Sequence, residues 1–564
     1  MIAPVAASAP CPACTARVSN RAAAFASSVV GIVACQERSA PLAGPAPATS
    51  ALGGDGAGGG PGGNAAADGK TLFEANCAVC HGTLGKGDGT AAYLLWPRPR
   101  DFSKGKYKIR STPSGSLPTD EDLLAVVTNG MPGSAMPAWR HFSEADRKAL
   151  VQRVKELSEY KDADMDAPYN FFKERAAGAP VAVPAEPADD AKSRNLGKEI
   201  YVKAGCVKCH GETGRSDGPS AADLKDDWEQ PIRPNDFTQG IYRGGSTAKD
   251  IYLRFATGMS GTPMPAYGAD QMNDEQRWAL VHYVQSLAGE APKALAAALP
   301  YGSELVATKV AAIPKDPDDA SWDAVPAVDV PLSLLFNRTA APRLLRVRAA
   351  HDGKRVAFQT SWQDSADNHA PLRAEDFRDA VAVMFALKGM DTPVAMGSKD
   401  KPVEVWHWKA DWQIDLEKWQ DVETIHPGMA VEMYPFEKND TTNVNRGNRP
   451  SAMPGQDKAW QSGWAAGNPM TDPARKSPCE IAVAAGFGTL TSLPAAEPSI
   501  AGKGVWKDGR WTVFQSRPLA APDGCCVEFK PGTEVPVAFA VWDGAAGDRA
   551  GQKSVAFWYR LVLK

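Results

Sequence analysis

The sequence contains no apolar run long enough to form a membrane-spanning helix. About 20 consecutive apolar residues are needed to cross a bilayer, and the longest run, residues 22–34, falls well short of that length. There is also no excess of charge of one sign, because 62 Lys and Arg residues are balanced by 66 Asp and Glu residues. Binding to nucleic acid requires a basic surface, so we expect no nucleic-acid partner.

The composition likewise lacks the signature of a disordered chain, which combines low hydrophobicity with high net charge. Hydrophobic residues make up 43% of the chain, and its formal net charge is -4. A chain of 564 residues is too long for one core, since domains average roughly 150 residues. We therefore expect several folded domains. No segment resembles a molybdopterin or iron-sulfur site.

The beginning of the chain has the anatomy of an export signal. Arg17 and Arg21 precede the longest apolar run, which ends at Cys35. The letters IVAC at this end resemble a bacterial lipobox, whose cysteine is lipidated after cleavage. We expect residues 1–35 to be a signal peptide of the lipoprotein type and residues 36–67, rich in Gly, Ala and Pro, to be a flexible tether. The mature protein would then be periplasmic and tethered by lipid at Cys35; a soluble secretory signal or a later translation start is the alternative.

Two cysteine motifs with the same spacing are the strongest indication of chemistry in the chain. They are Cys77, Cys80 and His81 in CAVCH, and Cys206, Cys209 and His210 in CVKCH. Both read C-x-x-C-H, the attachment signature of c-type haem. In such a site the two thiols bond to the porphyrin and the histidine binds the iron. A redox dithiol or half of a zinc site is the competing interpretation, but each motif opens a longer repeat.

The repeat extends well beyond the two motifs. RPRDFSKGKY in the first copy aligns with RPNDFTQGIY in the second, and each copy continues to a Met-Pro-Ala-aromatic segment. These segments contain Met136 and Met264, which offer a thioether to the iron. Apolar residues at helical spacing predict a helix after each Met, over residues 143–160 and 273–287.

Both copies resemble the class I cytochrome c family. The resemblance implies two small all-α domains, at residues 68–160 and 196–290, each wrapping one haem c. It also implies His/Met ligation of each iron, by His81 with Met136 and by His210 with Met264. The rival ligands Met131 and Met259 fit less well, because the family pattern has a proline directly after the ligating methionine. With both axial positions filled, these haems are expected to carry electrons only.

The last part of the chain differs from the two repeats, because its apolar residues occur at every second position and not at helical spacing. The alternating runs lie at residues 381–387, 535–541 and 555–561. Such alternation predicts strands, and we expect an all-β antiparallel sandwich at residues 321–564. Linkers are expected at residues 161–195 and 291–320. In an oxidising compartment, Cys479 is expected to form a disulfide with Cys525 or Cys526.

Five segments of this last part resemble the haem-b-binding γ subunits of the ethylbenzene dehydrogenase and dimethylsulfide dehydrogenase group, which accompany molybdenum enzymes of the DMSO reductase family. They are WDAVPAVDVPL, VRAAHDGKRVAFQTSWQD, FRDAVAVMFAL, AMGSKDKPVEVWHWKADW and GQKSVAFWYRLVL. The resemblance implies one b haem held by a Met and a Lys, which correspond to Met396 and Lys553. A lysine binds iron only as the neutral amine, so its pKa must fall well below about 10.4. The rival ligands are His407, Lys409 and His369.

These features together predict an exported trihaem electron-transfer protein that is not itself an enzyme. Two haem c groups and one haem b would pass electrons between a soluble cytochrome c and, by resemblance, the molybdopterin and iron-sulfur subunits of an oxidoreductase. Two other functions remain open. The chain could be a di-haem oxidoreductase of the thiosulfate dehydrogenase or peroxidase type, or a cytochrome carrying a haem-free carbohydrate-binding or adhesion sandwich.

Overall fold

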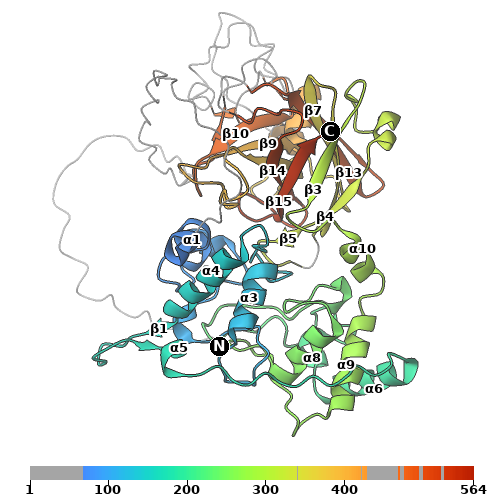
Figure 1. The fold of residues 1–564 in the computed structure, drawn as a ribbon. Helices are drawn as coiled ribbons and strands as arrows, with labels where there is room; N and C mark the ends of the chain where they lie inside the picture. The colour runs from blue at the N-terminus through green and yellow to red at the C-terminus, as the bar shows by residue number, and fades with distance from the viewer. Residues whose placement is uncertain are drawn as a thin grey trace, which may run out of the picture. The chain divides into compact units, whose positions relative to one another are not determined.

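The computed structural model describes residues 68–338, 341–418, 420, 422–427, 468–469, 475–493, 500–521 and 526–564. The expected signal peptide, the tether and the lipid anchor at Cys35 lie outside these residues, as does Cys525. Within the described part of the chain, no helix is both long and apolar enough to cross a bilayer. Helices dominate the earlier part of the chain, coloured blue to green, and strands dominate the later part, coloured yellow to red (Figure 1).

The first repeat consists of short helices joined by turns. Its elements are α1 (Gly69–Asn76), α2 (Ala78–His81), η2 (Ala92–Leu94), η3 (Phe102–Lys104), α3 (Asp120–Asn129), α4 (Glu144–Glu156), β1 (Glu159–Tyr160), β2 (Tyr169–Asn170) and α5 (Phe171–Glu174). The second repeat follows the same order. Its elements are α6 (Ala191–Lys203), α7 (Val207–His210), η4 (Phe237–Gln239), α8 (Ala248–Thr257), α9 (Asp274–Ser286) and α10 (Ala291–Ala297).

Equivalent helices of the two repeats begin at equivalent caps. Thr119 before α3 and Thr247 before α8 each form a capping box with an aspartate three residues later. Ser143 and Asn273 cap α4 and α9, at the starts of the two helices predicted from apolar spacing. Both predicted helices are therefore confirmed, and α4 ends earlier than expected, before strand β1.

Helices α1 and α4 of the first repeat, and the equivalent α6 and α9 of the second, pack against each other without space for a side chain. A Cβ atom added at Gly69 of α1 would lie 2.4 Å from the carbonyl oxygen of Ala149 in α4. The same addition at Gly197 of α6 would lie 2.0 Å from the carbonyl oxygen of Ala279 in α9. Glycine is needed at both positions because only a backbone without Cβ can approach this closely.

The later part of the chain forms one sheet of 13 strands. They are β3 (Glu304–Lys309), β4 (Val328–Pro331), β5 (Ser333–Leu334), β6 (Leu344–His351), β7 (Arg355–Gln363), β8 (Ala380–Ala386), β9 (Val403–Lys409), β10 (Cys479–Ala484), β11 (Thr491–Ser492), β12 (Ala501–Lys507), β13 (Arg510–Pro518), β14 (Glu534–Trp542) and β15 (Ser554–Leu563). Their order is β11-β10-β9-β8-β14-β15-β3-β6-β7-β13-β12, with β4 beside β6 and β5 beside β15. Short helices α11 (Ala410–Glu417), α12 (Val422–Ile425) and η5 (Ala320–Ala324) connect some of them.

The expected antiparallel sandwich is wrong in two respects, because the sheet is mixed and because all 13 strands belong to one curled sheet and not to two packed sheets. Strand β3 pairs in parallel with both β15 and β6, whereas the other pairings are antiparallel. β3 lies within the stretch expected to be a linker, and it joins the two halves of the sheet into one. Neither neighbour is joined to β3 by a hairpin, so no turn imposes antiparallel pairing on this strand.

The sheet curls so that strands far apart in its order face each other across one core (Figure 1). The ring of Phe358 in β7 lies 5.8 Å from the rings of Phe385 in β8 and Trp406 in β9. The predicted alternation holds in β8 and β14, whose inward residues enter this core. In β15 it breaks: a bulge in the pairing with β14 brings Ala556, not Phe557, into the core cluster.

Candidate haem sites

The two C-x-x-C-H motifs occupy equivalent one-turn helices, α2 and α7. Each helix ends at a glycine with positive φ, Gly82 and Gly211. A Cβ atom at either glycine would collide with an aspartate carboxylate, at 2.0 Å in the first repeat and 1.8 Å in the second. The glycines therefore allow the chain to turn sharply directly after the histidine.

Both histidines are oriented in the same way. The Nδ1 atom of His81 lies 3.0 Å from the carbonyl oxygen of Arg100, and the Nδ1 atom of His210 lies 3.0 Å from that of Asn235. This contact fixes the ring and leaves Nε2 for a metal. A phenylalanine stacks on each ring, with centroids 4.8 Å apart in the first repeat and 4.3 Å in the second.

Burial controls the charge of the cysteine and histidine side chains of the two motifs. It raises the pKa of the Cys77 thiol to about 12 and that of Cys80 to about 11. It also lowers the pKa of His210 to about 4, and that of His81 moves in the same direction. Near pH 7 both imidazoles are thus neutral, the form that binds iron.

The methionine segments also repeat closely. The backbone N–H of Met131 donates to the carbonyl oxygen of Met136 at 3.1 Å, and that of Met259 donates to Met264 at 3.2 Å. Met136 packs on the core cluster that Cys77 also borders, and Met264 packs on the corresponding cluster of the second repeat. Met131 and Met259 are absent from these clusters as described. Two thiols, one imidazole and one thioether around a single apolar core fit a haem c.

The outer face of the sheet offers a different apolar surface. Strands β8, β9, β10 and β14 present small residues there, opposite their bulky core-facing residues. The residues of this face, which we name the alanine face, are Ala380, Ala382, Ala386, Val403, Val405, Ala482, Ala484, Ala538, Trp542 and, from β15, Trp558. Apart from Trp542 and Trp558, the buried side chains of this face are small, whereas a protein core is normally filled by larger ones.

Both proposed haem b ligands border the alanine face. Met396 packs on its cluster and has a φ of 71°, a strained conformation for a residue other than glycine. The ammonium of Lys553 lies 4.7 Å from the ring centroid of Trp542, which belongs to the cluster. Burial lowers the pKa of Lys553 to about 8, which favours the neutral amine that iron requires. The face and its two donors fit a haem b.

Carboxylates engage two of the three rival ligands, whereas His407 stays a candidate. Lys409 makes an ion pair with Glu480 at 2.5 Å, and the Nδ1 atom of His369 lies 2.9 Å from a carboxylate oxygen of Asp367. His407 also borders this region, since its ring lies 4.8 Å from that of Trp542. Its Nδ1 atom is 3.5 Å from Glu480, while its buried Nε2 atom has no hydrogen-bond partner among the described residues.

Trp96 of the first repeat contacts the segment beside Lys553. The N–H of Leu335 donates to the carbonyl oxygen of Lys553 at 3.1 Å, and the N–H of Trp96 donates to that of Leu335 at 3.0 Å. The carbonyl oxygen of Trp96 accepts from Asn337 at 2.8 Å, and the Trp96 ring lies 5.2 Å from that of Phe336. No sequence pattern had indicated this contact, which depends on residues far apart in the chain.

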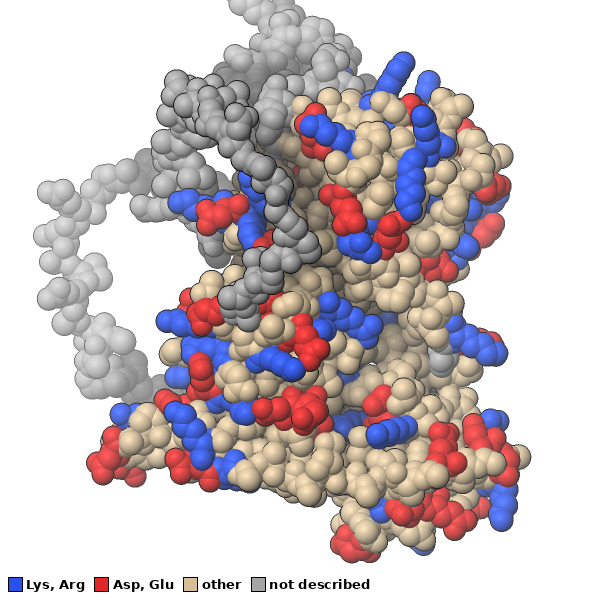
Figure 2. All heavy atoms as spheres, in the orientation of Figure 1, with Lys and Arg blue, Asp and Glu red and all other residues tan. Residues whose placement is uncertain are grey.

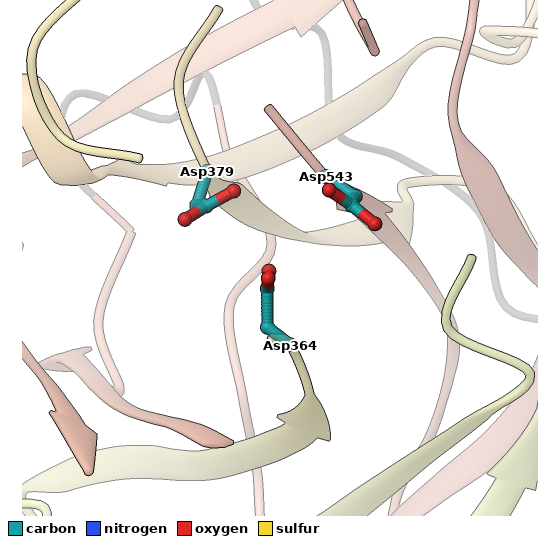
Figure 3. A group of neighbouring side chains, drawn as sticks. All are labelled: Asp364, Asp379 and Asp543. Carbon is teal, nitrogen blue, oxygen red and sulfur yellow. The ribbon is translucent and has the colours of Figure 1, made fainter. Parts of the chain in front are cut away.

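Three buried carboxylates meet at the ends of three strands. Asp364 follows β7, Asp379 precedes β8 and Asp543 follows β14, and Figure 3 shows their side chains converging. One ligand atom from each lies within 4.8 Å of the other two. Their oxygens accept hydrogen bonds from the indole groups of Trp362 and Trp511 and from several backbone N–H groups. These bonds tie the loops at the strand ends together, which is a structural role.

On the face drawn in Figure 2, basic and acidic side chains are interspersed, without a large area of one sign. This mixture agrees with the balanced composition. Cys479 is a buried thiol in the core cluster of the sheet, and Cys526 belongs to the same cluster. The disulfide expected for Cys479 stays a prediction, because Cys525 lies outside the described residues.

Comparison with known proteins agrees with this division of the chain. The family model for cytochrome C oxidase, cbb3-type, subunit III matches residues 64–152, that for cytochrome c matches residues 195–288, and that for ethylbenzene dehydrogenase matches residues 319–554. A protein of Haloferax mediterranei that carries the description respiratory nitrate reductase heme subunit is 27% identical over 254 residues, which are 44% of this chain and 68% of that protein.

Two γ subunits are similar to a comparable extent. That of chlorate reductase from Ideonella dechloratans is 24% identical over 255 residues, which are 43% of this chain and 78% of the subunit. That of dimethylsulfide dehydrogenase from Rhodovulum sulfidophilum is 25% identical over 260 residues, which are 43% of this chain and 72% of the subunit. Two parts of the chain thus match models of cytochrome c proteins, and a third part matches the model for ethylbenzene dehydrogenase.

Proposed function

We propose that this chain is an exported trihaem electron carrier with two haem c groups and one haem b. It passes electrons between a molybdenum and iron-sulfur oxidoreductase and a soluble cytochrome c. The names of its relatives, which are subunits of nitrate reductase, chlorate reductase and dimethylsulfide dehydrogenase, support an oxidoreductase as partner. A lipid at Cys35 would keep the carrier at the periplasmic side of a membrane.

The contact between Trp96 and the segment beside Lys553 carries this proposal. It joins the first cytochrome c domain by two successive hydrogen bonds to the residue proposed as a haem b ligand. Such a contact keeps the two proposed cofactor sites close together, and electron exchange between cofactors becomes faster as the distance between them falls.

Each proposed ligand has one task in this carrier. Haem iron supplies reversible one-electron exchange between its ferric and ferrous states. Cys77, Cys80, Cys206 and Cys209 attach the haem c groups covalently. His81 with Met136, and His210 with Met264, would hold the iron of the two haem c groups, and Met396 with Lys553 would hold that of haem b. Iron held by two side chains in this way would exclude small substrates and would carry electrons only.

Acid-acetone extraction of the purified full-length protein tests the haem count. We expect one b-type haem per chain in the extract and two haem c groups retained on the polypeptide. Replacing Lys553 with Ala should remove the extractable haem and leave both covalent ones. Replacing Lys401, a more exposed lysine paired with Asp391, is the matched control and should change neither.

Other outcomes would contradict the proposal. An extract without haem from the unmodified protein would favour the carbohydrate-binding or adhesion module. Rapid binding of cyanide to the unmodified protein would favour the di-haem enzyme, because it requires an open or exchangeable sixth position. Replacing Met136 with Ala should open that position in the first cytochrome c domain and serves as the positive control.

A further inference from the structure

Five basic side chains come together between the two cytochrome c domains. They are Arg100, Lys108, Arg110, Arg243 and Arg254, which we name the cationic seam. Lys108 and Arg110 are 8% and 1% exposed, and the other three are half-buried. Taking positive charges out of water is costly unless anions or hydrogen-bond acceptors compensate them.

Backbone oxygens compensate two members of the seam. Arg110 of the first domain donates to the carbonyl oxygen of Thr257 in the second, at 2.5 Å. Arg254 of the second domain donates to the carbonyl oxygens of Lys108, at 3.3 Å, and of Arg110, at 2.5 Å. These reciprocal bonds hold the two domains together.

The other three members have no such compensation within the described residues. No hydrogen bond or ion pair from a described residue reaches the side chains of Arg100, Lys108 or Arg243. The Nη1 atom of Arg100 and the Nε atom of Arg243 are buried without a hydrogen-bond partner. Arg100 lies 4.3 Å from the ring centroid of Trp228, a contact that adds no negative charge.

Three carboxylates act on Arg100, but two of them have other partners: Asp227 pairs with Lys106, and Asp101 accepts from Ser103 and Trp228. Only the third, Asp226, also acts on Lys108. Asp226 is 8% exposed, and its Oδ1 atom already accepts from the backbone N–H groups of Trp228 and Gln230 at 3.0 Å. Burial lowers the pKa of Lys108 well below its usual value, and the charges of Arg100 and Arg243 lower it further. The site therefore has more positive charge than the described acidic residues neutralise.

Two of the three cations adjoin a proposed haem site, and the third lies between them. The carbonyl oxygen of Arg100 holds His81, and the charge of Arg243 acts on His210. The charges of both arginines act on Lys108. Lys108 and Arg243 also occupy equivalent positions in the two repeats, after KGKY and QGIY. Anions that would reach this place from both sides are the haem propionates, and guanidinium groups bind carboxylates well.

We propose that Arg100, Lys108 and Arg243 form one anion site shared by the propionates of both haem c groups, which couples their redox potentials electrostatically. The proposal rests on the proposed function, because it needs both haems. A positive charge beside a haem stabilises the ferrous state, which carries one positive charge fewer. Lys108 therefore raises the potential of both haems, although it belongs to the first domain.

Potentiometric titration of the full-length protein, with the two haem c groups resolved by their spectra, tests this coupling. Lys108→Gln should lower both midpoint potentials, and Lys108→Arg should restore both. Lys104→Gln, an exposed lysine of the same segment, is the matched control and should leave both unchanged. A shift confined to one haem, or no shift, would overturn the proposal.

A second variant covers the case in which Lys108→Gln does not fold. Arg243→Gln lies in the second domain and should also lower the potential of the haem bound at Cys77 and Cys80. If both haems are bound but Arg243→Gln moves only the potential of its own domain, the shared site is wrong and the carrier function stands. If the unmodified protein holds no covalent haem, the function itself is wrong.

Discussion

Burial and neighbouring charges together shift the pKa values of buried carboxylates in this chain. In the carboxylate cluster, burial and the charge of Asp364 raise the pKa of Asp379 to about 7, while burial and the charge of Asp543 raise that of Asp364 to about 6. The folded state therefore holds protons that the unfolded state releases near pH 4. The stabilisation that these bound protons give the folded state is complete below about pH 4. It is lost as the pH rises through 6 to 7.

We expect Asp364→Asn to reduce this pH dependence, because it removes the repulsion between Asp364 and its neighbours. Between pH 5 and pH 8, the free energy of unfolding should fall by about 1–3 kcal/mol less in the variant than in the parent. Urea unfolding at each pH, in a buffer containing a chelator, measures this free energy of unfolding. Asp400→Asn, at an exposed position, is the control. An identical pH profile for Asp364→Asn and the parent would contradict the assigned ionisation.

Glycine decides how closely helices approach at the scale of secondary structure elements. In an isolated helix, Gly197→Ala would be stabilising by up to about 1 kcal/mol. In this fold it should instead destabilise the second cytochrome c domain by about 1–3 kcal/mol, because the new Cβ would overlap α9.

Thermal unfolding of the holoprotein, followed by haem absorbance, measures the effect of Gly197→Ala. Asn195→Ala is the matched control, since Asn195 is exposed on the same helix and the change favours helix formation. An unchanged or higher midpoint for Gly197→Ala would show that α6 and α9 are further apart than described.

The path between domains belongs to the scale of the whole molecule. Trp96→Ala should slow electron transfer between haem b and the haem c groups, because it removes the ring contact with Phe336. Trp96→Phe should retain most of the rate. This rate is measured by reducing haem b with a rapid-mixing pulse and following the absorbance at the haem c bands. Equal rates in the parent and in Trp96→Ala would exclude this contact as the route.

How much could be predicted from the sequence differs between the sites. The haem c ligands were open to prediction because their chemistry demands fixed local spacing, as in Cys77, Cys80 and His81. Met396 and Lys553 were assigned only by resemblance, since their pairing spans more than a hundred residues and leaves no local pattern. The equivalent basic residues Lys108 and Arg243 were visible in the repeat, yet only the packing of two domains shows that both are buried together.

The sequence by itself determined the two cytochrome c repeats, the helices after Met136 and Met264 and the alternating strands of the last domain. These features depend on contacts between near neighbours and on periodicity, which the order of residues encodes directly. The tertiary structure alone decided the parallel insertion of β3, the alanine face, the contact of Trp96 with the segment beside Lys553 and the cationic seam. Each of these depends on which distant segments share an interface, and chain order does not specify that.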